Sequence, residues 1–177
     1  MKTVRSIASL LFILTRAFAI GYLLTGVYVS GVLLFRADST GSSGWFRVLD
    51  NGSFQILYPF TEAPFLLGDN TTAFLTMMLS VIFFYGFFMW LLSSVFNTFR
   101  RKKLFTAPGV SRLSKFYLLN LIVPVVAVLI VAVLYNEILG DILMLTFLHL
   151  IIGIFAYFMA AIFRQGLLLQ EEQDLTL

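Results

Sequence analysis

The chain has 177 residues, of which 60% are hydrophobic and 12% are charged, with a formal net charge of +3 and a mean hydropathy of +0.96. So few charged side chains cannot cover the surface of a water-soluble domain of this length, so the composition excludes such a domain and predicts a protein embedded in a bilayer. The sequence contains no cysteine and one histidine, which excludes disulfides, thiolate catalysis and a metal site built from several Cys or His ligands.

The N-terminus resembles a cleavable signal peptide, with a basic start, an apolar stretch and an A-x-A pattern ending at Ala19. A signal peptide ends where its hydrophobicity ends, whereas this apolar run continues to Phe35. Residues 2–15 are therefore interpreted as an extension of the first helix or as an amphipathic segment on the inner membrane surface.

Four apolar runs follow, each long enough to cross the hydrocarbon at about 1.5 Å of rise per residue. They are residues 17–35, 73–96, 116–134 and 142–163. These runs predict an all-α integral membrane protein, in which residues 1–177 form a single membrane domain built as a bundle of four transmembrane helices.

The positive charges predict the orientation of the spans, because cytoplasmic segments next to spans carry most of the Lys and Arg. Of the twelve Lys and Arg, only Arg36 and Arg47 fall on the opposite side. We therefore expect cytoplasmic termini, a cytoplasmic loop at 97–115 and a cytoplasmic tail at 164–177. A basic patch in this loop consists of Arg100, Arg101, Lys102, Lys103, Arg112 and Lys115. Topology explains these cations most simply, and binding of anionic lipid or an acidic partner is the alternative.

Residues 36–72 form the predicted external loop, which contains a small β-hairpin. In "WFRVLDNGSFQILY", Asn-Gly stands between two segments rich in β-branched and aromatic residues. With Asn-Gly as a two-residue type I′ turn, Trp45 faces Tyr58 and Leu49 faces Phe54. The hairpin serves either as a lid over the helix ends or as a recognition surface.

The third and fourth spans are predicted to be antiparallel neighbours, because the connection "YNEILGD" is short. Thr106 is a suitable N-cap for the third helix, and Pro108 suits its first turn. Small residues at helical spacing predict close helix contacts. They are Ala17, Gly21, Thr25, Gly26, Ser30, Ala156 and Ala160.

His149 is the only ionisable side chain deep in a span, which makes it a functional candidate. Counting residues along the spans places Ser30, Ser80 and Tyr28 close to its depth. We expect a ring that is neutral at pH 7 and hydrogen-bonded to one of these three side chains. A bond that fixes helix register is the favoured interpretation, and a proton-linked or ligand-binding role is the other.

Asn120 and Pro124 form a second candidate site, because proline has no N–H and frees the carbonyl four residues before it. A helix kink is the favoured interpretation, and an ion or substrate site within reach of Arg16 is the alternative.

The terminal "LQEEQDLTL" is predicted to fold back onto the basic patch, with its acids pairing to Arg112 or Lys115 while Leu175 and Leu177 pack on apolar side chains. An equally weighted interpretation is a solvated helix end. The acids of this tail are Glu171, Glu172 and Asp174.

Two stretches, "LFTAPGVSRLSKFYLL" and "IFRQGLLLQEEQDLTL", resemble the bacterial membrane proteins of domain-of-unknown-function family 2975. The resemblance covers most of the chain, and the tail is its most specific part. Leu177 stands where a β-branched residue is more usual, and Pro108 departs from a commoner polar, acidic helix start. The resemblance implies four spans in the bacterial cytoplasmic (inner) membrane. Family members are often encoded near small helix-turn-helix regulators, which suggests regulation and implies no reaction.

The sequence shows no nucleophile–base pair, no paired carboxylates within a span and no phosphate loop, so we expect no enzyme, cofactor or metal. The first hypothesis is a non-enzymatic accessory or regulatory protein that acts through partner contacts. The alternative is a small transporter, channel or ligand-binding bundle that uses His149 and the Asn120–Pro124 kink. Expected partners are the lipid bilayer, anionic lipid at the cytoplasmic face, and a protein partner or a second copy, but not nucleic acid.

Overall fold

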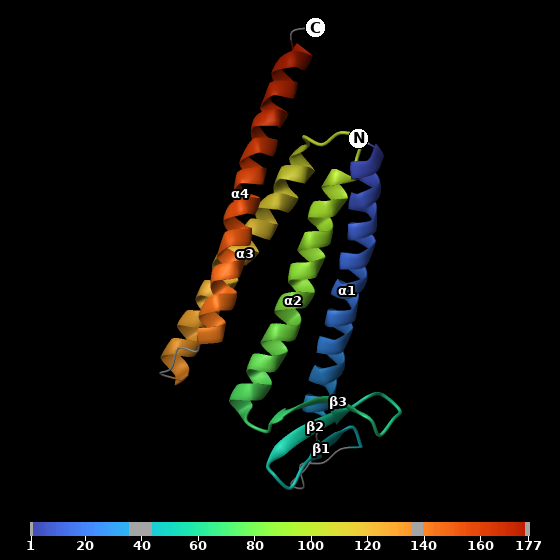
Figure 1. Ribbon diagram of the computed structural model, residues 1–177, viewed down its shortest axis with the longest axis vertical. Coiled ribbons are helices and arrows are strands. Elements are labelled where there is room, and N and C mark those ends of the chain that lie inside the picture. The colour runs from blue at the N-terminus through green and yellow to red at the C-terminus, as the bar shows by residue number, and fades with distance from the viewer. Residues whose placement is uncertain (1, 36–43, 136–139, 176–177) are drawn as a thin grey trace. The chain divides into compact units, whose positions relative to one another are not determined.

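The computed structural model describes residues 2–35, 44–135 and 140–175. Four helices account for most of these residues (Figure 1), and all four are long and apolar enough to cross a membrane. They are α1 (Lys2–Leu34), α2 (Thr72–Phe99), α3 (Ala107–Tyr135) and α4 (Gly140–Leu175). The predicted all-α membrane fold with four spans is therefore confirmed. Residues 36–43 of the predicted loop and residues 136–139 of the short connection lie outside the described residues.

Each helix extends beyond the apolar run from which it was predicted. Helix α1 begins at Lys2, so residues 2–15 continue the first helix, as one of the two interpretations expected. At the start of α3, the N–H of Gly109 donates to the hydroxyl of Thr106 over 3.2 Å. Thr106 is therefore the helix N-cap, and Pro108 lies in the first turn as predicted.

The chain divides into two compact units, and the boundaries between them fall inside α1 and α2. The helical unit comprises residues 1–16 and 88–177, and the sheet unit comprises residues 17–87. The helical unit therefore contains α3 and α4 together with the first part of α1 and the last part of α2. The sheet unit contains the remaining parts of α1 and α2.

In the helical unit, α3 and α4 pack against each other as an antiparallel pair (Figure 1), which confirms the predicted adjacency. Buried residues recur at intervals of three and four on both helices, the spacing that places side chains on one helix face. The buried stripes are His149, Gly153, Ala156, Ala160 and Phe163 on α4, and Leu113, Phe116, Asn120 and Pro124 on α3. The opposite faces expose large apolar side chains, such as Phe155 and Phe158 on α4, which suits contact with lipid.

Several predicted small-residue contacts hold, and one does not. Ala156 and Ala160 are buried. In the sheet unit, a Cβ added at Gly26 of α1 would lie 2.9 Å from the Phe83 ring of α2, so this close approach suits glycine. A Cβ at Gly21 would meet nothing within 4 Å, so the predicted contact at Gly21 is wrong.

A three-stranded antiparallel sheet of order β1-β2-β3 lies between α1 and α2 in the sequence. Its strands are β1 (Phe46–Val48), β2 (Ser53–Leu57) and β3 (Pro64–Asp69). The predicted hairpin is β1–β2, but β3 was not predicted. The run "PFLLGD" contains proline and glycine, both depleted from strands, and its proline is tolerated because it is the first residue of an edge strand.

The predicted register of the hairpin is wrong by one residue. Val48, rather than Leu49, lies opposite Phe54. The same shift applies along the hairpin, so Trp45 does not pair with Tyr58. Because side chains alternate between the two faces of a sheet, a shift of one residue changes which residues of β1 face the core.

The turn explains this shift, because it contains three residues rather than two. The N–H of Gly52 donates to the carbonyl of Leu49 over 2.9 Å, and the N–H of Leu49 donates to the carbonyl of Ser53 over 2.8 Å. Gly52 has a φ of 81°, in the left-handed region that glycine adopts without strain. A turn that ends in a left-handed glycine is the common three-residue hairpin loop with a bulge.

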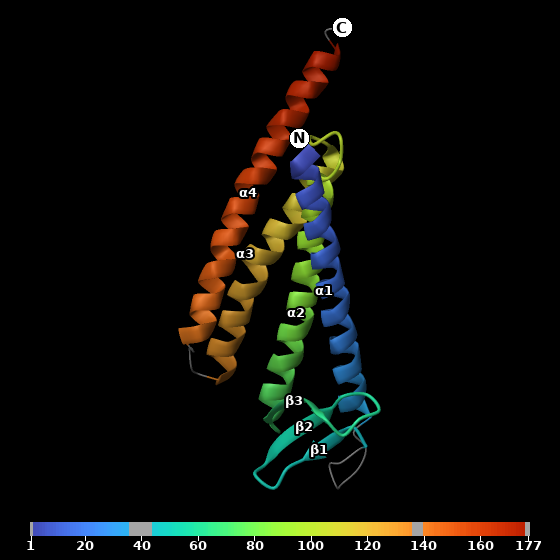
Figure 2. The same ribbon diagram turned by 45° about the vertical axis from the view of Figure 1, so that its right-hand side comes forward.

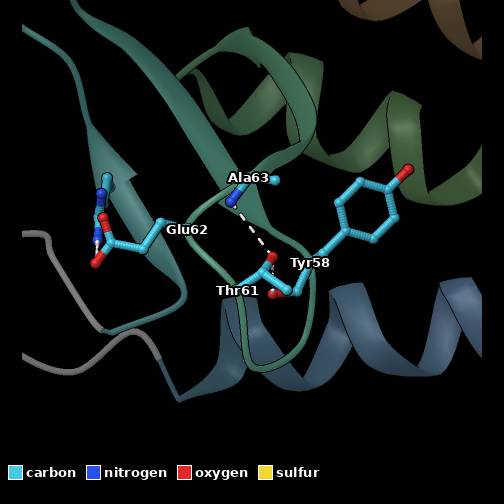
Figure 3. A network of polar contacts seen from close by, with 5 residues as sticks. Tyr58, Thr61, Glu62 and Ala63 are labelled. Atoms are coloured by element: carbon cyan, nitrogen blue, oxygen red, sulfur yellow. Dashed lines mark hydrogen bonds and ion pairs between the residues drawn. The ribbon is translucent and has the colours of Figure 1, made fainter.

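The connection between β2 and β3 is held by its own polar contacts (Figure 3). The N–H of Tyr58 donates to the carbonyl of Ala63 over 2.9 Å. The hydroxyl of Thr61 donates to the Tyr58 carbonyl and accepts from the Ala63 N–H, each over 3.3 Å. Glu62 also forms an ion pair of 3.5 Å with Arg47. Exposed ion pairs contribute only about 0–1 kcal/mol, so the hydrogen bonds hold this turn.

The sheet packs on the ends of α1 and α2 within the sheet unit (Figure 2). The rings of Phe46 and Phe54 stack with centroids 5.7 Å apart. Val29 of α1 and Leu75 of α2 complete the same buried cluster. The hydroxyl of Tyr28 donates to the carbonyl of Leu57 over 2.6 Å, which ties α1 to β2 by a polar bond as well.

Candidate functional site

The most buried polar contact in the described chain joins α3 to α4. Nδ1 of His149 lies 2.8 Å from Oδ1 of Asn120, and both residues are buried. The two residues that the sequence singled out as separate candidates therefore form one site. His149 lies nine residues after the start of α4. In an antiparallel pair, the residue at the same level of α3 lies nine residues before the end of that helix, at position 126. Asn120 is within about two helical turns of that position. The predicted antiparallel pair thus makes Asn120 a nearby polar candidate for His149 but does not single it out.

Asn120 is held in a fixed orientation by its own helix. Its Nδ2 donates to the carbonyl of Phe116 over 2.8 Å, so its Oδ1 is turned toward His149. An amide oxygen only accepts hydrogen bonds, so Nδ1 of His149 is the donor. In a neutral ring this leaves the lone pair on Nε2. The bond thus selects one tautomer of the histidine.

An aromatic ring from α2 packs directly against the histidine. The ring of Phe88, from α2, meets His149 edge-on at a centroid distance of 5.3 Å and an interplanar angle of 88°. Phe88 also lies 5.4 Å from Phe116 of α3. Both phenylalanines are buried. Residues from α2, α3 and α4 therefore meet at the histidine, in surroundings where an unpaired polar atom is costly.

The hydrogen-bond partner that the structure shows for His149 is Asn120, which is not one of the three predicted side chains. Tyr28 donates to the Leu57 carbonyl, and Ser80 donates to the carbonyl of Thr76 over 2.8 Å. Ser30 is half-buried on α1, and all three residues belong to the sheet unit. Matching depth in the bilayer could not separate these side chains from Asn120, because depth does not determine which helices are neighbours.

One interpretation of the sequence placed Arg16 within reach of Asn120. The structure shows no bond between them. Its guanidinium lies over the ring of Trp90, 3.7 Å from the centroid, and 5.4 Å from the centroid of Phe12. The guanidinium of Arg100 lies 4.4 Å from the same Phe12 ring. We call these four residues the cation–aromatic cluster. This cluster was not predicted from the sequence, although Phe12 and Arg16 have the i, i+4 spacing of neighbours on a helix.

The basic patch lies on the connection between α2 and α3 and on the first turns of α3. Arg100 to Lys103 are exposed, as is Lys115, whereas Arg112 is half-buried. Arg101 lies within electrostatic reach of Arg112. The patch therefore brings like charges together.

Of the two interpretations of the tail, the fold-back is wrong, and the solvated helix end is the one observed. Helix α4 continues to Leu175 (Figure 1), so residues 164–174 continue the helix away from the start of α3 instead of turning back. Leu177 lies outside the described residues. Glu171, Glu172 and Asp174 are exposed, and no described acid of α4 forms an ion pair with Arg112 or Lys115. Near the start of this extension, the ring centroids of Phe163 and Phe105 lie 5.3 Å apart, and a Cβ added at Gly166 would lie 2.6 Å from the Phe105 ring.

The chemistry available to these residues is limited to hydrogen bonding, charge and apolar contact. Within the described residues, no three His, Cys, Asp or Glu side chains are grouped so that they could hold a metal ion. Every buried side-chain nitrogen or oxygen in that part of the chain has a hydrogen-bond partner. The buried polar pair is thus a satisfied contact between helices.

Residues 45–177 match the model of a protein family described as protein of unknown function (DUF2975). The match begins just before β1 and includes α2, α3, α4 and the tail. No curated protein and no solved structure matches the chain. Because the match covers most of the sequence and the four apolar helices fit a four-span protein, the chain belongs to the DUF2975 family.

Proposed function

We propose that this protein is a non-enzymatic accessory or regulatory protein of the bacterial cytoplasmic membrane, and that it acts by binding a protein partner through the end of α4. One observation carries the proposal. Helix α4 extends about 18 Å beyond the predicted end of its span at Phe163, at 1.5 Å per residue, and this extension exposes Leu168 and Leu169. Exposed neighbouring leucines outside the hydrocarbon suit a protein contact better than water.

The charges of the extension define the kind of partner that it fits. Glu171, Glu172 and Asp174 follow the two leucines on the exposed helix. A helix that presents apolar side chains beside acids is recognised by an apolar groove with a basic rim. The expected partner is therefore a protein with such a groove.

The orientation on which this proposal depends is testable, because the chain contains no cysteine. We expect cytoplasmic termini and a cytoplasmic basic patch, since most cations fall on that side of the spans. Glu62 and Lys103 are both exposed, so cysteines at these positions are accessible to a reagent. Thr98, also next to the basic patch, is buried and does not suit labelling. In intact cells a membrane-impermeant maleimide should label Glu62→Cys and should label Lys103→Cys only after permeabilisation. The reverse pattern would show that the orientation is inverted.

The tail itself is tested by deleting residues 171–177 and by photo-crosslinking. The described tail makes no ion pair with its own chain, so the deletion should leave the melting temperature in detergent unchanged. A photoreactive amino acid at Leu168 should give a discrete adduct with one other protein in native membranes. The same probe at Ile154, which is also exposed but lies within the predicted span, should not give that adduct.

A charge reversal separates specific binding from chance proximity. Changing Glu171 and Glu172 together to lysine should abolish the adduct formed from position 168 while the chain remains in the membrane at the same abundance. An adduct that survives this reversal, or that forms equally from Ile154, would refute the proposed role of the tail.

A transporter, channel or ligand-binding bundle has less support. Transport paths through membranes are lined by several polar or charged residues. In the described chain the buried polar side chains are Ser93, Thr98, Asn120 and His149. The hydroxyls of Ser93 and Thr98 bond to carbonyls of their own helix, and Asn120 and His149 bond to each other. These side chains serve helix packing.

A further inference from the structure

Two arginines share one aromatic ring in the helical unit. Arg100, just past the end of α2, places its guanidinium 4.4 Å from the centroid of Phe12, and Arg16 of α1 lies 5.4 Å from the same centroid. Arg16 also covers Trp90 at 3.7 Å. The cation–aromatic cluster therefore holds two positive charges at one place, although Arg16 lies in α1 and Arg100 lies just past the end of α2.

The cluster has no acidic partner in the described chain. Within residues 2–35, 44–135 and 140–175, the ion pair present joins Arg47 to Glu62. Contact with an aromatic face contributes only about 0.5–2 kcal/mol per cation, and two like charges at one ring repel each other. Arg101 follows Arg100 in the sequence and adds a third positive charge next to the cluster. Its charge also acts on Arg112. The local field therefore favours an anion.

The position of the cluster identifies the source of that anion. Arg16 directly precedes the first predicted span, which begins at residue 17, and Arg100 follows the second, which ends at residue 96. Two independent predictions therefore place both guanidinium groups at one membrane boundary. Trp90, whose ring lies under Arg16, is a residue type enriched at such boundaries. The anions concentrated there are the phosphates of lipid headgroups.

We propose that Arg16 and Arg100 bind the phosphate of one anionic phospholipid, with Phe12 and Trp90 packing beside its glycerol and upper acyl chain. Guanidinium groups suit this ligand because each can donate two parallel hydrogen bonds to phosphate oxygens. An anionic headgroup is favoured over a zwitterionic one because its net charge offsets the paired arginines. This site goes beyond the proposed function, since it requires the membrane but no protein partner.

The experiment uses the full chain purified in a neutral detergent. Phosphatidylglycerol and phosphatidylcholine with identical acyl chains are titrated in parallel, and the lipid retained is measured by native mass spectrometry beside the melting temperature. The wild-type chain should retain phosphatidylglycerol selectively and melt at a higher temperature with it. Arg100→Gln should weaken retention by about tenfold or more, the factor expected for loss of one hydrogen bond between charged groups.

Matched variants keep the proposal falsifiable. Lys103→Gln removes an exposed cation of the same patch and should retain phosphatidylglycerol like the wild type. Arg100→Lys keeps the charge but not the paired donors. Its retention of phosphatidylglycerol should lie between that of the wild type and that of Arg100→Gln. Arg16→Gln is compared only if its lipid-free melting temperature matches that of the wild type. It should then retain as little phosphatidylglycerol as Arg100→Gln.

Three results would overturn the site. Equal losses of phosphatidylglycerol retention in Lys103→Gln and Arg100→Gln would indicate diffuse attraction by the whole basic patch. Equal retention of the two lipids would show that the headgroup charge is not recognised. An equal rise in melting temperature with inorganic phosphate alone would assign the cluster to a soluble anion instead of a lipid.

Discussion

Replacing Gly153 with leucine is expected to force α3 and α4 apart and to produce the largest loss of stability of any single change considered for this chain. A Cβ at Gly153 would lie 2.7 Å from Cδ2 of Leu121 and 3.2 Å from Cβ of Asn120. Both distances are shorter than ordinary van der Waals contact, and α3 is the main partner of α4. Overpacking of this kind costs about 1–3 kcal/mol, and separation of the helices also breaks the bond between Asn120 and His149.

The measurement is the melting temperature in detergent, with Gly21→Leu as the matched control. Gly21 also lies inside a membrane helix, but a Cβ there would meet nothing within 4 Å. We expect Gly21→Leu to melt close to the wild type and Gly153→Leu to melt well below it. Similar melting temperatures for the two variants would show that the close approach at Gly153 does not limit the packing of α3 on α4.

Replacing Asn120 with leucine is expected to destabilise the chain by removing the acceptor that faces Nδ1 of His149. Leaving a buried donor without that acceptor costs about 1–3 kcal/mol in proteins generally. Hydrogen bonds between membrane helices contribute less, about 0.6 kcal/mol on average and up to about 1.7. The fully buried position and the 2.8 Å distance favour the upper part of that membrane range, so we expect a loss of roughly 1–1.7 kcal/mol.

A double-mutant cycle with His149→Leu isolates this bond. Once Asn120 is replaced, removing His149 should cost less than it does in the wild type, because the two residues stabilise the fold as a pair. Ser93→Ala is the control, since Ser93 is buried but bonds only to the carbonyl of Trp90 on its own helix. Additive effects of Asn120→Leu and His149→Leu would show that the contact contributes no coupling energy.

The features predicted correctly from the sequence are those that depend on local chemistry or on chain length. The four helices follow from apolar runs of the right length, and Thr106 caps α3 because its hydroxyl accepts the N–H of Gly109. The adjacency of α3 and α4 follows from their short connection. In each case the residues that determine the structure are close together in the sequence.

The features that were missed depend on conformations or contacts that residue types do not encode strongly. Asn-Gly suits a two-residue turn, yet the positive φ falls on Gly52 at the end of a three-residue turn, and one residue decides the register. His149 was matched by depth to Ser30, Ser80 and Tyr28, although Asn120 on the antiparallel neighbour was the contact.

The fold-back interpretation of the tail failed because ion pairs and the packing of Leu175 and Leu177 were expected to overcome the preference of its residues for helix. Residues 164–174 are rich in leucine, glutamine and glutamate, which are good helix formers. Gly166 is the only helix-weakening residue among them, and it packs against Phe105. Attractions of about 0–1 kcal/mol per exposed pair are too weak to end such a helix.

The small sheet has a mechanical consequence for α1 and α2. Only Asn70 and Thr71 separate β3 from α2, and Thr71 caps that helix by accepting the N–H of Phe74 over 3.2 Å. On the other side, Tyr28 bonds α1 to β2. The short link, the Tyr28 bond and the shared buried cluster hold the sheet against both helix ends, so the sheet sets their spacing. A force applied to the sheet would therefore tilt α1 and α2 together.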